Sequence, residues 1–402
     1  MVARRHRAAG QAVTRAERFP VGAAVTLAEL EADPHPALAR LRAAEPVSWL
    51  PALDGWLVTR RDLALEAMRD AGRFTVEDPR FSTGRVVGPS MLTLDGDEHA
   101  RHRAPFAPPF KLAAVRERFG ALVREETDRL IDAFAADGAA ELRRGLAGPL
   151  AATATAAALG FSQARADEVL AWYDAIVASV TAITAGADPT PEGAAGFTAL
   201  RAALRPALAG DAVDSLVAAA AGHAGGLEHE QVVANAAVLL FGGIETTEGM
   251  IASAVLHLLE RPALLAAARD DPALLPAVVE ESLRLEPAAA VIDRYATRDT
   301  TLGGAEIGER ELVVLSIAGA NRDPVAFPDP DTFDPHRPDL RRHLAFAAGP
   351  HVCIGMHLAR LEAHAVLARL LDRLPGLRLD PDRPAEIRGL VFRKPVALHV
   401  RW

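Results

Sequence analysis

The residue that most constrains this chain is Cys353, its only cysteine. It lies between Gly349 and Gly355, directly before a helical pattern over 356–367. A thiol at the N-terminus of a helix lies near free backbone N–H groups and the positive end of the helix dipole, which favours the metal-binding thiolate. The two glycines allow the backbone to fold tightly over the sulfur. A lone cysteine is otherwise most often a small core residue, so a core thiol and a metal ligand are both open interpretations.

The composition excludes several classes of protein. Half of the 402 residues are hydrophobic and 24% are charged, which favours a globular protein with a large core over a disordered one. The formal net charge is −9, so no nucleic-acid partner is expected, because phosphate binding needs clustered positive charge. A single cysteine allows no internal disulfide and is typical of a reducing compartment. No apolar segment follows the basic residues 1–7 and no run of about 18 apolar residues occurs, so we expect a cytoplasmic protein without a membrane anchor.

The sequence pattern predicts a mainly α-helical protein with small β-sheets, an α+β fold. Most of the chain has apolar residues at helical spacing, interrupted by glycine and proline. Short aromatic or β-branched runs predict strands at 47–50, 55–59, 291–292 and 311–316. Because no linker or repeat is evident, we expect a loose N-terminal arm over 1–20 and a single domain over 21–402. Residues 74–89 are rich in Gly, Pro, Ser and Asp and predict a long loop.

The longest helical pattern, over 228–260, would be roughly 50 Å long if continuous. Its middle is apolar on all sides, which is typical of a helix that crosses the core. Gly242 and Gly243 would each cost about 1 kcal/mol there relative to alanine, and Glu245 and Thr246 add polar groups. Local preferences are expected to fail at functional sites. Glycine would leave room for a flat ligand, and the threonine hydroxyl can bond back to a carbonyl or hold a water. A purely structural glycine kink is the alternative.

Two shorter patterns place acidic or basic residues at helical spacing. His99 and Arg103 are four positions apart and share a helix face, and Glu281 and Arg284 are three positions apart. Each pattern alone is also compatible with an ordinary solvated surface.

Together these motifs resemble those of the cytochrome P450 monooxygenases. The haem-binding loop of that family is matched at Phe346, Gly349, His351, Cys353 and Gly355. Glu281 and Arg284 resemble the family's Glu-x-x-Arg pair, 242–247 resembles its oxygen-activation segment, and 99–103 resembles its propionate-binding helix. The motifs follow one another in the family's order. Ala347 is a departure, because that position is usually glycine; we expect it to alter the turn without removing ligation.

The resemblance implies the cytochrome P450 fold, with the long central helix over the haem, and haem b (iron protoporphyrin IX) as cofactor. Cys353 would be the axial metal ligand, and its thiolate favours O–O cleavage. The cofactor-binding residues implied are His99, Arg103, Gly242, Gly243, Arg294, Phe346, Gly349, His351, Cys353 and Gly355. The basic members of this set would neutralise the haem propionates. Glu281 and Arg284 would be a structural pair behind the cysteine loop.

The implied activity inserts one atom of dioxygen into a hydrophobic organic substrate by hydroxylation or epoxidation. Glu245 and Thr246 would be the catalytic residues, with Thr246 orienting a water and Glu245 relaying protons. The predicted pocket residues are Leu239, Leu240, Val291, Ile292, Val391 and Phe392. Terpenoid, polyketide, aromatic and fatty-acid substrates are all open, and a role in secondary metabolism is expected.

The electrons are expected to come from a ferredoxin or similar protein, because the chain ends soon after the ligand helix without a fused reductase. Basic residues that could dock an acidic partner are Arg101, Arg341, Arg342 and Arg360. We expect a monomer.

Two other functions are open at this point. One is a related oxidase that couples phenols or closes rings without inserting oxygen. The other is a non-catalytic haem carrier or sensor, against which Glu245 and Thr246 argue because a carrier needs no proton relay.

Overall fold

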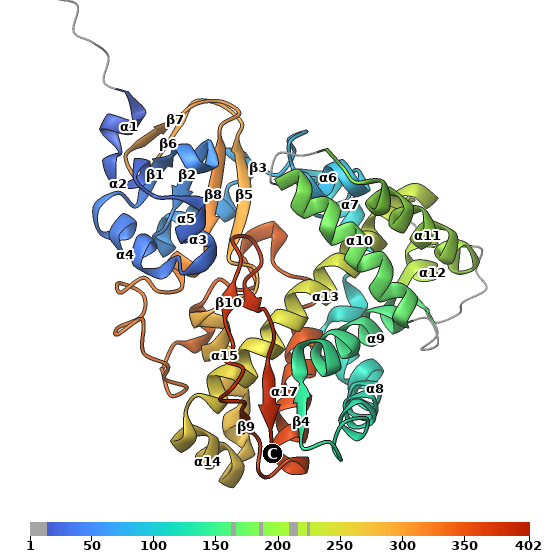
Figure 1. Ribbon diagram of the computed structural model, residues 1–402. Helices are drawn as coiled ribbons and strands as arrows, with labels where there is room; N and C mark the ends of the chain where they lie inside the picture. The colour runs from blue at the N-terminus through green and yellow to red at the C-terminus, as the bar shows by residue number, and fades with distance from the viewer. Residues whose placement is uncertain (1–13, 162–165, 185–187, 209–215, 223–225) are drawn as a thin grey trace, which may run out of the picture.

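The computed structural model describes residues 14–161, 166–184, 188–208, 216–222 and 226–402. Over these residues the protein is mainly helical with four small sheets, which confirms the predicted fold class. Figure 1 shows α13 (His229–Leu259) crossing the middle of the molecule. The five-stranded sheet and the N-terminal helices lie on one side of it, and a larger group of helices lies on the other.

The helices and strands have the following bounds. The α-helices are α1 Arg15–Arg18, α2 Pro20–Ala23, α3 Leu27–Ala32, α4 His35–Ala44, α5 Arg61–Arg69, α6 Ser82–Val87, α7 Gly96–Arg103, α8 Leu112–Asp132, α9 Gly148–Leu159, α10 Ala166–Thr184, α11 Pro191–Leu208, α12 Leu216–Ala221, α13 His229–Leu259, α14 Pro262–Asp270, α15 Leu275–Leu285, α16 Ile317–Ala320 and α17 Met356–Arg373. The strands are β1 Val47–Leu50, β2 Gly55–Val58, β3 Phe74–Thr75, β4 Ala139–Glu141, β5 Val291–Ala296, β6 Thr300–Leu302, β7 Ala305–Ile307, β8 Leu312–Ser316, β9 Arg378–Leu379, β10 Ile387–Arg388, β11 Lys394–Pro395 and β12 His399–Arg401.

The central helix α13 matches the pattern predicted over 228–260 within one residue at each end. It packs against α9, α15 and α17. Its length and composition would suffice to cross a membrane, but 83% of its most apolar window is buried inside the protein. It is therefore a core helix, as its apolar middle predicted.

The largest sheet has the strand order β1-β2-β8-β5-β3. In β5, successive side chains point to opposite faces of the sheet. Ile292 and Arg294 lie opposite Leu315 and Val313, which belong to the core cluster beneath α5. The opposite face packs beneath α3 and α4. Alternate residues of β5 therefore face different core clusters, one on each side of the sheet, near the site described below.

Two expectations for irregular segments are corrected. Residues 1–13 of the predicted arm lie outside the described residues, but 14–20 are ordered rather than loose. Thr14 caps α1, and the Arg15 guanidinium lies 4.6 Å from the ring centre of Trp49, so these contacts hold the segment against the sheet. The predicted loop over 74–89 contains β3 and α6, because Phe74 pairs with β5 and the face of α6 that carries Thr83 and Val87 is buried.

Candidate active site

A cavity of about 790 Å³ brings together motifs that are far apart in the sequence. Gly242 and Thr246 of α13 and Cys353 of the loop before α17 all line it. The remaining lining is mostly apolar and comes from several elements, among them α3, α4, α6, α10, β5 and the C-terminal hairpin of β10 and β11. The cavity therefore has the composition of a pocket for an apolar ligand.

The cysteine loop holds its sulfur at the wall of this cavity. Cys353 N donates a hydrogen bond of 2.9 Å to the carbonyl of Phe346, which closes the loop. Gly349 has φ +73°, and a Cβ there would lie 2.6 Å from the carbonyl oxygen of Met68, so glycine is required.

The thiol of Cys353 has an accessible surface although it lies deep within the fold, because that surface lines the cavity. Burial raises the pKa of the Cys353 thiol, while hydrogen bonds from the backbone N–H groups of Gly355 and Met356 oppose the rise. The guanidinium groups of Arg103 and Arg360 also oppose it. A positively charged metal ion at the sulfur would favour the thiolate further.

Ala347 adopts the left-handed conformation, with φ 57°. This conformation costs a non-glycine residue about 1–2 kcal/mol. Ala347 N still donates to the carbonyl of Leu344 at 2.8 Å, so the turn keeps the left-handed form that glycine would favour.

Four basic side chains predicted to bind propionates lie near the cysteine loop. The ring centres of His99 and His351 are 4.4 Å apart, and Arg103, Arg294 and His351 line the cavity. Arg103 donates to the carbonyl of Val352 at 2.6 Å, and Arg294 donates to the carbonyl of Asp293 at 2.7 Å. The fold thus gathers these four basic side chains beside the cysteine loop.

Asp95, which the sequence analysis missed, orients this group. The His351 ring donates to its carboxylate at 2.8 Å, and Val76 N and the Thr75 hydroxyl also donate to it. Burial raises the pKa of Asp95, but the hydrogen bonds from His351, Thr75 and Val76 outweigh it and lower that pKa to about 2. Its position before α7 was the available signal, since aspartate is common at helix N-termini.

The basic group fits the carboxylates of a haem. Nε2 of His99 is buried without a hydrogen-bond partner among the described residues, which is costly unless a further group binds it. Burial, together with His351 and Arg103, lowers the pKa of His99 to about 4. Burial also lowers the pKa of Arg294, whose guanidinium makes its hydrogen bond in the described structure only to a carbonyl. An anionic group at this place would satisfy both side chains.

On α13, the hydroxyl of Thr246 donates to the carbonyl of Gly242 at 2.7 Å, one of the two arrangements predicted. A Cβ at Gly242 would meet nothing within 4 Å, so this residue leaves the cavity wall open. A Cβ at Gly243 would lie 2.6 Å from Oγ1 of Thr155 in α9, so the second glycine also permits close helix packing.

Glu245 is buried and bound by two side chains that the sequence analysis missed. Its carboxylate lies 2.7 Å from Nζ of Lys394 and accepts a hydrogen bond from the hydroxyl of Tyr173. Lys394 also lies 2.7 Å from Glu248, which in turn pairs with Arg143 at 3.1 Å. Glu248 lies three positions after Glu245, so helical spacing could have predicted that it belongs to this group. Lys394 is remote in sequence, and no local pattern indicated that it pairs with Glu245.

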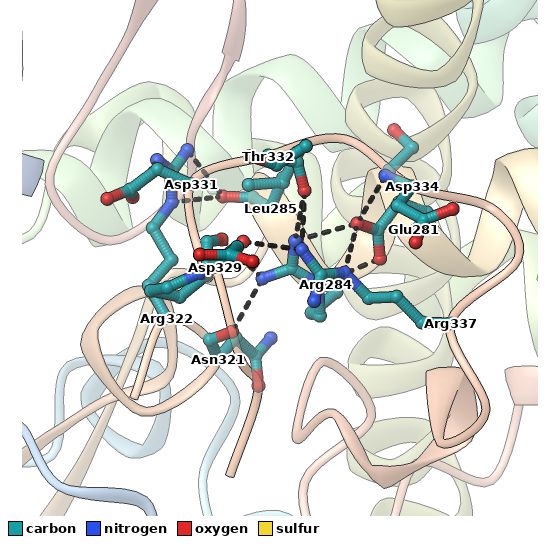
Figure 2. Close-up of polar contacts among 12 residues, drawn as sticks. Glu281, Arg284, Leu285, Asn321, Arg322, Asp329, Asp331, Thr332, Asp334 and Arg337 are labelled. Carbon is teal, nitrogen blue, oxygen red and sulfur yellow. Dashed lines mark hydrogen bonds and ion pairs between the residues drawn. The ribbon is translucent and has the colours of Figure 1, made fainter. Parts of the chain in front are cut away.

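The pair Glu281 and Arg284 is fully buried and doubly hydrogen-bonded, with both N–O distances 2.7 Å (Figure 2). Arg284 also donates to the carbonyls of Asn321, Pro330 and Thr332. Glu281 accepts from the backbone of Asp334 and from Arg337. The pair therefore holds the coil that leads into the cysteine loop and does not line the cavity.

Five of the six predicted pocket residues line the cavity, namely Leu239, Val291, Ile292, Val391 and Phe392. Leu240 does not, and this prediction is corrected. One residue further along a helix turns by about 100°, so Leu240 faces the core, where it is fully buried.

Three of the four arginines predicted to dock a partner have carboxylate partners of their own. Arg101 pairs with Glu98, Arg342 with Asp339, and Arg360 with the buried Glu280. Arg360 also lies over the ring of Phe346, at 4.4 Å, so it supports the cysteine loop.

Comparisons with known proteins agree with this geometry. The Cytochrome P450 family model matches residues 199–386. Nocardicin C N-oxygenase of Nocardia uniformis subsp. tsuyamanensis is 36% identical over 416 residues, covering 97% of this chain and 99% of that protein. Cytochrome P450 monooxygenase PikC of Streptomyces venezuelae is 35% identical, covering 93% and 92% of the two chains. The solved structure of P450BioI, in complex with an acyl carrier protein, aligns with a TM-score of 0.83 at 27% identity, covering 92% and 98%.

The fold and the site thus define a haem-thiolate protein. The chain belongs to the cytochrome P450 family. It is an oxidoreductase, a P450 monooxygenase with a haem cofactor. Its P450 homologues use small-molecule substrates, dioxygen and redox partners.

Proposed function

We propose that this monooxygenase inserts one oxygen atom into a hydrophobic organic substrate by hydroxylation or epoxidation, with haem b as its cofactor. The observation that carries the proposal is that Cys353 and Thr246 line one cavity whose other walls are mostly apolar. Electrons would come from a ferredoxin-like protein, and we infer a cytoplasmic monomer of one domain.

Cys353 would bind the haem iron, and His99, Arg103, Arg294 and His351 would bind the propionates. When bound, the haem supplies dioxygen activation, which a thiolate ligand favours by donating electron density. The N–H groups of Gly355 and Met356 would moderate that donation.

The residues of α13 would supply protons on the substrate side. The Thr246 hydroxyl is satisfied by the Gly242 carbonyl and can exchange this partner for a water in the cavity. Glu245, Lys394 and Glu248 form a continuous chain of ionisable groups that runs from α13 to the C-terminal hairpin and back to α13. Such a chain supports proton transfer to the site while the apolar walls exclude bulk water.

The test is the absorption spectrum of the reduced, CO-bound protein. The red-shifted band of a thiolate-ligated haem is expected in the wild type and should be lost in Cys353→Ser. A folded wild-type protein without that band would refute the proposal. Once a substrate is found by its spin-state shift, incorporation of label from ¹⁸O₂ should accompany turnover, whereas a coupled product without label would establish the oxidase alternative instead.

A further inference from the structure

The cavity has a second side that the haem residues do not use. Asp293 lies directly after Ile292 and before Arg294 in β5, and it lines the cavity. It pairs in register with Val314 of β8. Because paired residues project to the same face, its side chain is on the face opposite that of Arg294.

That face is strongly apolar. Val314 packs there with Leu30, Leu38 and Leu57, beneath α3 and α4. All four of these leucine and valine residues also line the cavity, as Asp293 does. The cavity thus extends past the edge of β5 to a chamber whose walls are aliphatic and contain one carboxyl on the strand.

The carboxyl of Asp293 has no hydrogen bond or ion pair within the part of the chain that the structure describes. Arg294, its neighbour, binds only the Asp293 backbone carbonyl. Burial raises the pKa of Asp293 to about 6, against the opposing effect of Arg294. A carboxylate in such surroundings costs free energy unless a partner of opposite charge binds it.

The other carboxylates of the cavity wall differ in their partners, their burial or their charge state. Glu245 is bound by Lys394 and Tyr173. Oε2 of Glu362 in α17 also has no hydrogen-bond partner among the described residues, but this side chain is buried, and burial raises its pKa well above the ordinary value, which favours its neutral form. Glu31 is exposed to solvent, so water satisfies its charge. The residues described also contain no cluster of side chains suited to a metal ion.

We propose that Asp293 binds a positively charged group of the substrate, a protonated or quaternary amine, while the apolar part of the substrate occupies the rest of the cavity. The inference rests on the proposed function, because it assigns this cavity to the substrate. It narrows the substrate class from hydrophobic molecules in general to hydrophobic cations. Asp293 is a specificity residue and takes no part in oxygen activation.

The experiment compares two probes of equal chain length, decyltrimethylammonium and decan-1-ol. The quaternary nitrogen has no lone pair and cannot ligate iron, so the measured affinity reflects contacts with the side chains of the cavity. Isothermal titration of the haem-loaded wild type should give a dissociation constant at least about tenfold lower for the cation, which corresponds to about 1.4 kcal/mol. Asp293→Asn, which keeps the side-chain shape, should remove this preference while binding of decan-1-ol stays within about twofold.

Glu31→Gln is the matched control, because Glu31 lines the same cavity but is exposed. It should keep the preference for the cation. The inference is overturned if the wild type shows no preference, if Asp293→Asn retains it, or if Glu31→Gln abolishes it. The CO-bound spectrum of the same samples tests the proposed function separately. A missing thiolate band would refute the proposed function, whereas a normal band without a preference for the cation would refute only the role of Asp293.

Discussion

Lys394 Nζ lies 2.7 Å from Glu245 and 2.7 Å from Glu248, so one cation of the C-terminal hairpin neutralises two carboxylates of the central helix. Arg143 also pairs with Glu248, whereas Lys394 is the cation that pairs with Glu245 in the described structure. This relationship ties the end of the chain to the middle of α13.

Replacing Lys394 with methionine should therefore leave Glu245 buried without its cation. Breaking a buried ion pair costs about 3–5 kcal/mol, and we expect a loss near the lower end in urea unfolding, because Lys394 is partly accessible. The double variant Lys394→Met/Glu245→Gln should recover most of this loss. If the double variant is as unstable as the single one, the stability of this region does not depend on the pair.

Thr246→Ala tests the role of the hydroxyl on α13. The haem spectrum should remain, because Thr246 does not belong to the group that holds the haem. Oxygen consumption should yield severalfold more hydrogen peroxide per oxygen used, because the hydroxyl that orients a water is gone. Peroxide and oxygen are measured together, and Thr246→Ser, which keeps the hydroxyl, should resemble the wild type. Equal peroxide yields in all three proteins would contradict the assigned role.

Glu281→Gln tests the buried pair of Figure 2. The substitution leaves the Arg284 guanidinium fully buried without its counter-charge, and we expect a loss of about 3–5 kcal/mol and poor haem retention. Asp331→Asn, which removes the exposed partner of Arg322, is the control and should cost less than about 1 kcal/mol. Stability is measured by thermal unfolding. Equal losses in the two variants would show that burial does not decide how much an ion pair stabilises this protein.

Ala347→Gly should stabilise the protein. Glycine adopts φ 57° without the steric cost of about 1–2 kcal/mol that alanine has. The greater freedom of glycine in the unfolded chain offsets part of this gain, so the net rise in the free energy of unfolding should be about 1 kcal/mol. Ala348 has an ordinary extended conformation, with φ −152°, and Ala348→Gly should instead destabilise by roughly 0.4–1 kcal/mol. Denaturant unfolding measures both, and the same sign for the two variants would contradict the argument.

His257 should make stability depend on pH. Burial lowers the pKa of this histidine to about 4, despite the opposing effect of Glu286, and its Nδ1 lies 2.9 Å from the Ser282 hydroxyl. Between pH 6.5 and 4 the unfolded state binds a proton at this residue and the folded state does not, so stability present above pH 6.5 is lost as the pH falls. The difference amounts to at most about 3 kcal/mol.

Unfolding free energies measured at pH 7 and pH 4.5 check this prediction. His257→Gln removes the titration and should reduce the difference between the two values. His336→Gln replaces an exposed histidine and should leave the difference as in the wild type. An unchanged pH dependence in His257→Gln would show that other groups account for it.

The local sequence determined much of the fold and marked Cys353 as a candidate metal ligand. The glycines around Cys353, the apolar middle of α13 and the spacing of Glu281 and Arg284 are local patterns, and local backbone preferences and helical periodicity are sufficient to read them. The same periodicity also explains the one wrong pocket residue, because the orientation of Leu240 depends on the rotation of α13 relative to its neighbours.

The tertiary structure alone decided which partners these residues have. Lys394 and Glu245 are 149 positions apart in the sequence, and they pair only because the C-terminal hairpin packs on α13. Asp95 reaches His351, and Asp293 lies beside Val314, through the packing of elements that come from distant parts of the chain. A carboxylate has the same formula in a loop, an ion pair or an apolar chamber, and its charge state and role follow from the surroundings that folding provides.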